Sequence, residues 1–273
     1  MLSQEKFLNI RNITISSIHE TLNHLYLNCS EDYVLFLAGG EYDELIANSK
    51  NCIKEKISPY CIDGFWMDSY NDGTRLQFLC EFLNRYYNFN DNQLEDNIYR
   101  INIEFLIYTH IWESNPFLKQ FYRVVHLYTG HEYEWNLKLK SFGKSNFIEK
   151  NLISLSKKTP IAFVNEYYNR DLRNSIAHSD YHLDAKDKKI GYYPNNSRVT
   201  RVISFDEWNL YFVHSCLFSY YLTKIISERR KDIINAWGRN YFTIKMPFSD
   251  GTIRHAVLEY DVTNDAFNFV QKT

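Results

Sequence analysis

The scarcity of glycine and proline constrains the fold of this chain more than any other sequence feature. Its 273 residues include only nine Gly and five Pro, fewer than the average shares of about 7% and 5% predict. Both residues interrupt regular helices, so a chain poor in them is biased toward long helical segments. The length allows one large domain or two small ones around a sizeable core. We therefore expect a mainly α-helical protein.

Charge and cysteine content narrow the functional classes. A net charge of −2 excludes a globally basic polyelectrolyte but allows local basic patches. The five cysteines are scattered and form no C-x-x-C pair, which favours thiols of a reducing compartment over a disulfide framework or zinc knuckle. They are Cys29, Cys52, Cys61, Cys80 and Cys216.

The sequence predicts no targeting or membrane segment. Polar and charged residues occupy the N-terminus, where a signal peptide has an apolar run. The apolar stretches 33–38 and 210–222 are too short or too interrupted to span a bilayer. We expect a cytoplasmic protein without a membrane partner.

Turn signals divide the first part of the chain. Gly39-Gly40, Ser58-Pro59 and Asn71-Asp72-Gly73 predict breaks between several helices. The polar run 88–93 predicts a linker. We therefore expect residues 1–95 to form a helical N-terminal region, and no motif in it indicates a function.

Residues 96–235 are expected to form a helical bundle. Apolar residues at three- and four-residue spacing predict one helix from 98 to about 115 and a second over 117–128. Pro160 predicts the start of a third helix, with an apolar stripe of Phe163, Tyr167, Leu172 and Ile176 that continues to His178.

Strands and a long helix are expected after the third helix. A β-hairpin is predicted near 189–203, with its turn at 194–197. Ser204 and Glu207 have the spacing of a capping box that starts a helix reaching about Arg230. Alternation from Tyr241, with a turn at 249–251, predicts a small β-meander within a C-terminal β extension over 236–273.

The strongest chemical motif is Arg173-Asn174-x-x-x-His178, within Leu172-Arg173-Asn174-Ser175-Ile176-Ala177-His178. A guanidinium is a permanent cation whose fork matches phosphate oxygens. An imidazole can take up and return a proton near neutral pH. On a helix, Asn174 and His178 would lie one turn apart on the same face. This pattern has the minimum equipment for cutting RNA without a metal.

With its apolar surroundings, the motif resembles that of the HEPN superfamily of nucleotide-binding and ribonuclease domains. The resemblance covers roughly residues 96–235 and implies a four-helix core, with neither a cofactor nor a metal. It implies that the 2′-OH of RNA attacks the adjacent phosphodiester. Arg173 would stabilise the charge on phosphorus oxygens, His178 would act as base or acid, and Asn174 would orient the histidine or the phosphate.

The resemblance also implies a homodimer in which two motif helices face each other, since one protomer supplies only one histidine for a reaction that uses an acid and a base. In such a dimer, Arg173 and His178 would be partly buried in a shared groove. Implied roles are a toxin or anti-phage defence effector, with RNA and a possible antitoxin or trigger protein as partners. Some family members recruit an acidic residue from an earlier helix, for which Glu104 and Glu113 are candidates.

One feature departs from the family pattern. Some HEPN toxins have a modified tyrosine in the sequence His-x-Tyr, but here Tyr181 lies one residue further along. That mode of regulation is therefore not expected.

The residues leave other interpretations open. Arg173 could pair with Asp171 or Glu166 while His178 caps a helix C-terminus, a favourable place for a cation. His178 and His182, with Asp184, have the spacing of a helical metal site. A non-catalytic HEPN module that binds nucleotide, RNA or protein as a scaffold is the alternative function.

Overall fold

A computed structural model describes residues 2–48, 58–63, 65–139, 143–194, 200–247 and 252–270, with the backbone alone for residues 45, 65–73 and 76. Cys52, positions 195–197 of the turn expected at 194–197, and the turn expected at 249–251 lie outside the described residues.

The protein is mainly helical, with small antiparallel sheets. Its α-helices are α1 (Gln4–Asn28), α2 (Ser30–Leu37), α3 (Glu44–Ala47), α5 (Phe65–Tyr86), α6 (Ile98–Glu113), α7 (Asn115–Tyr128), α8 (Lys144–Phe147), α9 (Ser154–Ser156), α10 (Arg170–Ala177), α11 (Phe205–Lys231) and α12 (Ile233–Trp237). A π-helix (Ile148–Ile153) and a 3₁₀-helix (Ala162–Glu166) lie between α8 and α10.

Short strands accompany these helices. They are β1 (Glu41–Tyr42), β2 (Tyr60–Cys61), β3 (Phe89–Asn90), β4 (Gln93–Leu94), β5 (Tyr181–Asp184), β6 (Lys189–Tyr192), β7 (Arg201–Ser204), β8 (Tyr241–Pro247), β9 (Ile253–Asp261) and β10 (Ala266–Phe269). Each described pairing between these strands is antiparallel.

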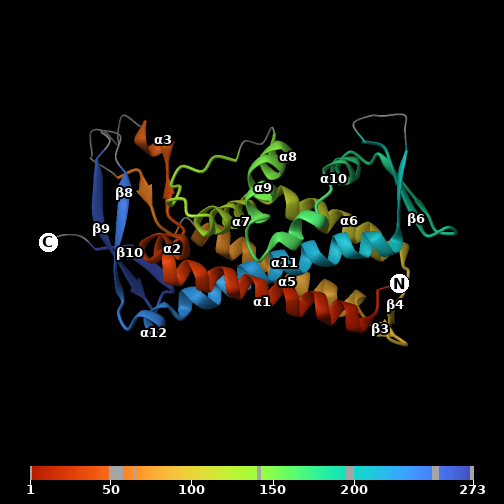
Figure 1. Cartoon of the computed structure of the whole chain (residues 1–273), viewed down its shortest axis with the longest axis horizontal. Coiled ribbons are helices and arrows are strands. Elements are labelled where there is room, and N and C mark those ends of the chain that lie inside the picture. The colour runs from red at the N-terminus through yellow and green to blue at the C-terminus, as the bar shows by residue number, and fades with distance from the viewer. Residues whose placement is uncertain are drawn as a thin grey trace.

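The long helices run together along the long axis of the molecule (Figure 1). Helix α11 contacts α1, α5, α6 and α7. The buried apolar side chains form one contiguous cluster, in which Trp112, Trp208, Phe121 and Phe218 are among the largest fully buried residues. Because this cluster includes residues from 2 to 267, all three expected segments contribute to the same core. The boundaries at 95 and 235 remain a prediction.

Local sequence signals set several of the helix ends. Asn97 caps α6 by accepting a hydrogen bond from the Arg100 amide at 3.1 Å. Ser204 and Glu207 form the predicted capping box of α11. Helix α7 ends before Gly130, whose φ of +84° favours glycine. The two helices expected within 98–128 and the long helix after Ser204 are confirmed.

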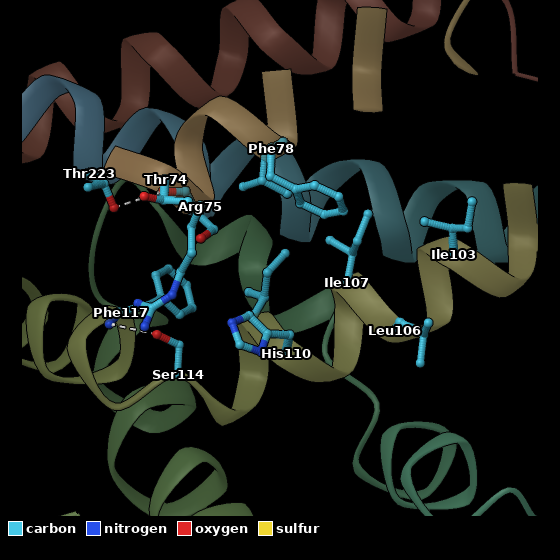
Figure 2. A pocket seen from close by; sticks show the side chains of 13 residues that line it. Thr74, Arg75, Phe78, Ile103, Leu106, Ile107, His110, Ser114, Phe117 and Thr223 are labelled. Carbon is cyan, nitrogen blue, oxygen red and sulfur yellow. Dashed lines mark hydrogen bonds between the residues drawn. The ribbon is translucent and has the colours of Figure 1, made fainter. Parts of the chain in front are cut away.

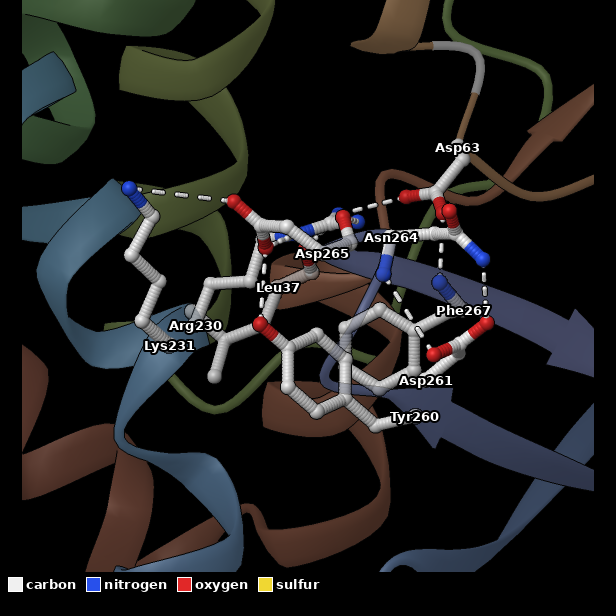
Figure 3. A network of polar contacts seen from close by, with 9 residues as sticks. All are labelled: Leu37, Asp63, Arg230, Lys231, Tyr260, Asp261, Asn264, Asp265 and Phe267. Carbon is white, nitrogen blue, oxygen red and sulfur yellow. Dashed lines mark hydrogen bonds and ion pairs between the residues drawn. The ribbon is translucent and has the colours of Figure 1, made fainter.

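The C-terminal meander is also confirmed, with strand order β10-β9-β8. Buried Arg230 connects it to the helices (Figure 3): its guanidinium bonds Asp63 at 2.5 Å and Asp265 at 3.1 Å. Asp63 also accepts a hydrogen bond from the Phe267 amide at 2.5 Å, and the Tyr260 hydroxyl donates to Asp265 at 2.7 Å. These contacts hold the sheet against α11 and the segment after β2.

The hairpin expected near 189–203 is present as β6 and β7, and β5 adds a strand that the sequence analysis did not predict. The His182 ring lies over Gly191, where a Cβ would come within 2.2 Å of it. Figure 1 shows this sheet at one end of the molecule and the C-terminal sheet at the other.

Two expectations for the first part of the chain are wrong. The backbone of 71–73 is helical within α5, because packing of α5 on α11 outweighs a local turn preference. The run 88–93 is not an extended linker: it forms most of the β3–β4 hairpin, with Asp91 and Asn92 at positive φ. The Gln4 amide donates to the Asn92 carbonyl at 3.1 Å, so this hairpin is bound to the start of α1.

The last two sequence expectations concern membrane-spanning segments and the cysteines. None of the described helices combines the length and apolar character that a membrane-spanning segment needs. The described cysteines, Cys29, Cys61, Cys80 and Cys216, are free thiols.

Candidate functional site

Helix α10 carries the Arg-Asn-x-x-x-His motif, and both of its ends have defined caps. The Asn169 side chain accepts a hydrogen bond from the Leu172 amide at 3.0 Å, which starts the helix. At the other end, the amides of Ser179 and Asp180 bond the carbonyls of Ile176 and Ser175 at 3.1 and 2.7 Å. This is a Schellman motif, with Ser179 at φ +60° where glycine is usual. The helix therefore ends at His178.

The motif helix does not begin at Pro160, as the sequence analysis expected. A 3₁₀-helix over 162–166 is separated from α10, so Phe163 and Tyr167 do not share a helical stripe with Leu172 and Ile176. The buried Tyr108 hydroxyl lies in this break, where it donates to the Tyr167 carbonyl at 3.4 Å and accepts from the Asn169 amide at 3.3 Å. Tertiary contacts thus satisfy backbone groups that a continuous helix would have paired internally.

Arg173 is buried and covered by a carboxylate from an earlier helix. The residue is 7% exposed, and its guanidinium pairs with Glu113 at the end of α6. It also donates to the Asn174 side-chain oxygen at 2.7 Å and to the Ser145 hydroxyl at 3.2 Å. Burial lowers the pKa of Arg173. The expectation of a partly buried Arg173 is wrong for this single chain, because Glu113 and the 143–147 segment close over it.

Lys144 adds a second cation that the sequence analysis missed. Its ammonium lies 3.2 Å from the Glu113 carboxylate and donates to the Glu113 carbonyl at 2.7 Å. Burial lowers the pKa of Lys144, whose side chain is 12% exposed, whereas that of Glu113 is 41% exposed. Buried Arg173 and half-buried Lys144 therefore converge on one partly exposed carboxylate. No local pattern around Lys144 identifies it in advance, since only the fold brings 144 next to 113 and 173.

Asn174 belongs to the Arg173 cluster. Its side-chain oxygen accepts from Arg173 and lies 3.5 Å from the Ser145 hydroxyl. Its connection to His178 runs through the backbone, where the His178 amide donates to the Asn174 carbonyl at 3.0 Å. Asn174 therefore orients the guanidinium rather than the imidazole in this structure.

His178 is the exposed member of the motif. It occupies the C-cap of α10, and its ring has no hydrogen-bond or ion-pair partner among the described residues. Both nitrogens are therefore available to a ligand. The structure brings Arg173 and Asn174 together with Glu113 and Ser145, but it does not bring the imidazole into this cluster.

The two acidic candidates differ in their surroundings. Glu113 contacts Arg173, whereas Glu104 is fully buried in a different polar network. Glu104 accepts from Arg100 at 2.5 Å, from the Tyr87 hydroxyl at 2.8 Å and from the Trp208 indole at 2.7 Å. Burial raises the pKa of Glu104, against the effect of Arg100. Glu104 is a core residue in this structure.

The alternative readings of the motif are resolved in part. His178 does lie at a helix C-terminus, but the carboxylate that pairs with Arg173 is that of Glu113, not Asp171 or Glu166. Asp171 instead pairs with Arg201 at 2.8 Å. His182 is on β5, beyond the end of α10, so it is not one helical turn from His178. The described residues contain no group of three or more metal-ligating side chains.

Comparisons of the chain with protein-family models, with curated proteins and with solved structures find no match.

Proposed function

We propose that the chain is a metal-independent endoribonuclease of HEPN type, in which α10 carries the reactive groups. The supporting observation is that Arg173 and Lys144 both contact the carboxylate of Glu113. Arg173 belongs to α10, and this helix is followed directly by His178, whose ring is exposed. Two cations that bind a carboxylate can also bind a phosphodiester, because both groups are anions with several acceptor oxygens. Buried Nε of Arg173 has no hydrogen-bond partner among the described residues.

The reaction follows from these groups. A histidine takes the proton of the ribose 2′-OH, and the 2′-oxygen forms a bond to phosphorus. The bond from phosphorus to the 5′-oxygen breaks, and a second acid returns a proton to that leaving oxygen. Arg173 stabilises the charge that develops on the non-bridging oxygens. The products are a 2′,3′-cyclic phosphate and a free 5′-OH, and DNA is excluded because it has no 2′-OH.

A homodimer supplies the second proton-transfer group. Arg173 is buried within its own chain while His178 faces outward. Twofold packing of α10 against a second copy would place each His178 where it can reach a phosphate held by either Arg173. The 22 Tyr and 19 Phe of the chain suit such an interface. Mixing Arg173→Ala with His178→Ala chains tests this, since a composite site regains activity in the mixed dimer.

RNA cleavage in EDTA tests the reaction. Wild-type protein should leave 2′,3′-cyclic phosphate ends, and His178→Ala and Arg173→Ala should not. Matched controls are Arg170→Ala, an exposed cation on the same helix that pairs with Glu149, and His182→Ala, an exposed histidine on β5. Because Arg173 is buried, Arg173→Lys is included as a variant that keeps the charge but loses the fork. Full cleavage by folded His178→Ala protein would exclude the proposal.

A non-catalytic scaffold is the second candidate, and the closed Glu113–Arg173 pair favours it. In that case, the site would bind nucleotide, RNA or protein without reacting. Expression in bacteria separates the two, as a toxin or defence nuclease slows growth far more than its His178→Ala variant. A scaffold gives equal growth with both chains.

A further inference from the structure

An open pocket of about 600 Å³ lies between α5, α6, α7 and α11, on a part of the molecule that the proposed reaction does not use. Its volume falls in the range of about 300–1,000 Å³ that is typical of small-molecule sites. Neither Arg173 nor His178 lines it. Two apolar side chains at its rim are unusually exposed: Leu106 at 72% and Phe78 at 51%.

The lining of the pocket is divided by polarity. Figure 2 shows Phe78, Ile103, Leu106 and Ile107 along one part. Arg75, His110 and Ser114 gather at the other end, together with the ring of Phe117. Burial lowers the pKa of His110, and the positive charge of Arg75 lowers it further. The cation therefore acts directly on the polar end of the pocket.

A second hollow, of about 420 Å³, continues from the polar end. It shares Arg75, His110 and Ser114 with the apolar pocket, and it adds Asn115, Pro116, Glu113 and Lys119. Glu113 already pairs with Arg173 and Lys144. Lys119 pairs with Glu41 at 2.7 Å. At this end an incoming anion thus meets the Arg75 guanidinium, an amide and a hydroxyl beside two ion-paired carboxylates, and at the other end an aliphatic surface.

We propose that this pocket binds a long-chain carboxylate, with the alkyl chain between α5 and α6 and the carboxylate at Arg75 and His110. An alkyl chain matches the aliphatic lining, because each methylene that packs there removes apolar surface from water. The carboxylate matches the cationic end and explains why the two kinds of lining residue are separated. This inference does not rest on the ribonuclease proposal, because neither Arg173 nor His178 lines the pocket, although Glu113 of the adjoining hollow contacts Arg173.

Calorimetric titration of the full chain with dodecanoate, below its micelle concentration, tests the site. One carboxylate should bind per chain, and dodecylammonium, which has the same chain length and the opposite charge, should bind at least tenfold more weakly. Arg75→Gln should remove this preference by weakening dodecanoate binding roughly tenfold, as expected for one charge-assisted hydrogen bond. Arg85→Gln, on the same helix and outside the pocket, should leave it unchanged.

Leu106→Glu tests the apolar part with little risk to folding, because the residue is 72% exposed. It should weaken dodecanoate at least tenfold, whereas Leu27→Glu, at a position on α1 that is 75% exposed, should not. Ile103→Trp, which fills the groove, should have the same effect as Leu106→Glu. Circular dichroism verifies that each variant is folded.

Three results would overturn the inference. One is no binding of dodecanoate, and another is binding of several molecules with no effect of Leu106→Glu or Ile103→Trp. The third is a dimer in solution that Leu106→Glu dissociates and that takes up no dodecanoate, since the groove would then be an interface between copies of the chain.

Discussion

The carboxylate of Glu113 covers the guanidinium of Arg173, the cation that the sequence motif singles out. Glu113 lies in the last turn of α6 and Arg173 in the middle of α10, and Lys144 reaches the same carboxylate from a third segment. Any anion that binds Arg173 must therefore compete with Glu113. The balance of this competition is open to direct measurement.

Glu113→Gln should tighten the binding of a short single-stranded RNA about fivefold. The change removes a negative charge beside two cations, and a partly exposed pair of this kind is worth about 1 kcal/mol. Fluorescence anisotropy with a labelled oligonucleotide measures the affinity. Glu149→Gln is a matched control, because Glu149 is also 41% exposed and pairs with an arginine of α10. Equal or weaker RNA binding by Glu113→Gln would contradict this expectation.

Tyr108→Phe should lower the free energy of unfolding by about 1–3 kcal/mol. The substitution leaves the Tyr167 carbonyl and the Asn169 amide without the hydroxyl that bridges them in a buried region. Urea denaturation measures the change. Tyr99→Phe is the control, since Tyr99 is 82% exposed, and a loss no larger than that of this control would show that the hydroxyl does not stabilise the break before α10.

Glu104→Gln should destabilise the protein by about 3–5 kcal/mol, as removing one partner of a buried ion pair usually does. Arg100, 1% exposed, would lose its counter-charge, and the amide could not accept from all three present donors. Thermal melting measures the loss of stability, and Glu20→Gln, at an exposed position on α1, is the control. If Glu104 is a core residue, any remaining folded protein keeps its RNA affinity. Loss of RNA binding without loss of stability would instead assign Glu104 to the site.

His214 should make stability depend on pH between about 4 and 6.5. Burial lowers its pKa from 6.5 to about 4, and its ring stacks on Tyr167 at 3.6 Å. In this window the unfolded chain binds a proton that the folded chain does not, so stability falls as the pH falls, by at most about 3 kcal/mol. The measurement is urea denaturation across the window for wild type and His214→Phe. The difference between the two curves should vary with pH, and parallel curves would argue against this role.

Signals that act over a few residues were sufficient for several elements. The apolar spacing after Ile98 predicted α6, the Ser204–Glu207 capping box predicted the start of α11, and the alternation after Tyr241 predicted the C-terminal meander. The motif also drew attention to Arg173 and Asn174, which do lie together. By contrast, Asn71-Asp72-Gly73 has a strong local turn preference and is nevertheless helical.

The sequence by itself therefore determined the helical class, the capped start of α11 and the alternation of the C-terminal strands, because these depend on composition and on neighbours along the chain. Only the tertiary structure decided that α10 starts at Arg170, that Glu113 and Lys144 meet at Arg173, and that an apolar pocket opens beside His110. These features arise from burial and charge pairing between segments far apart in the chain. Such contacts depend on how the helices pack, which local periodicity does not specify.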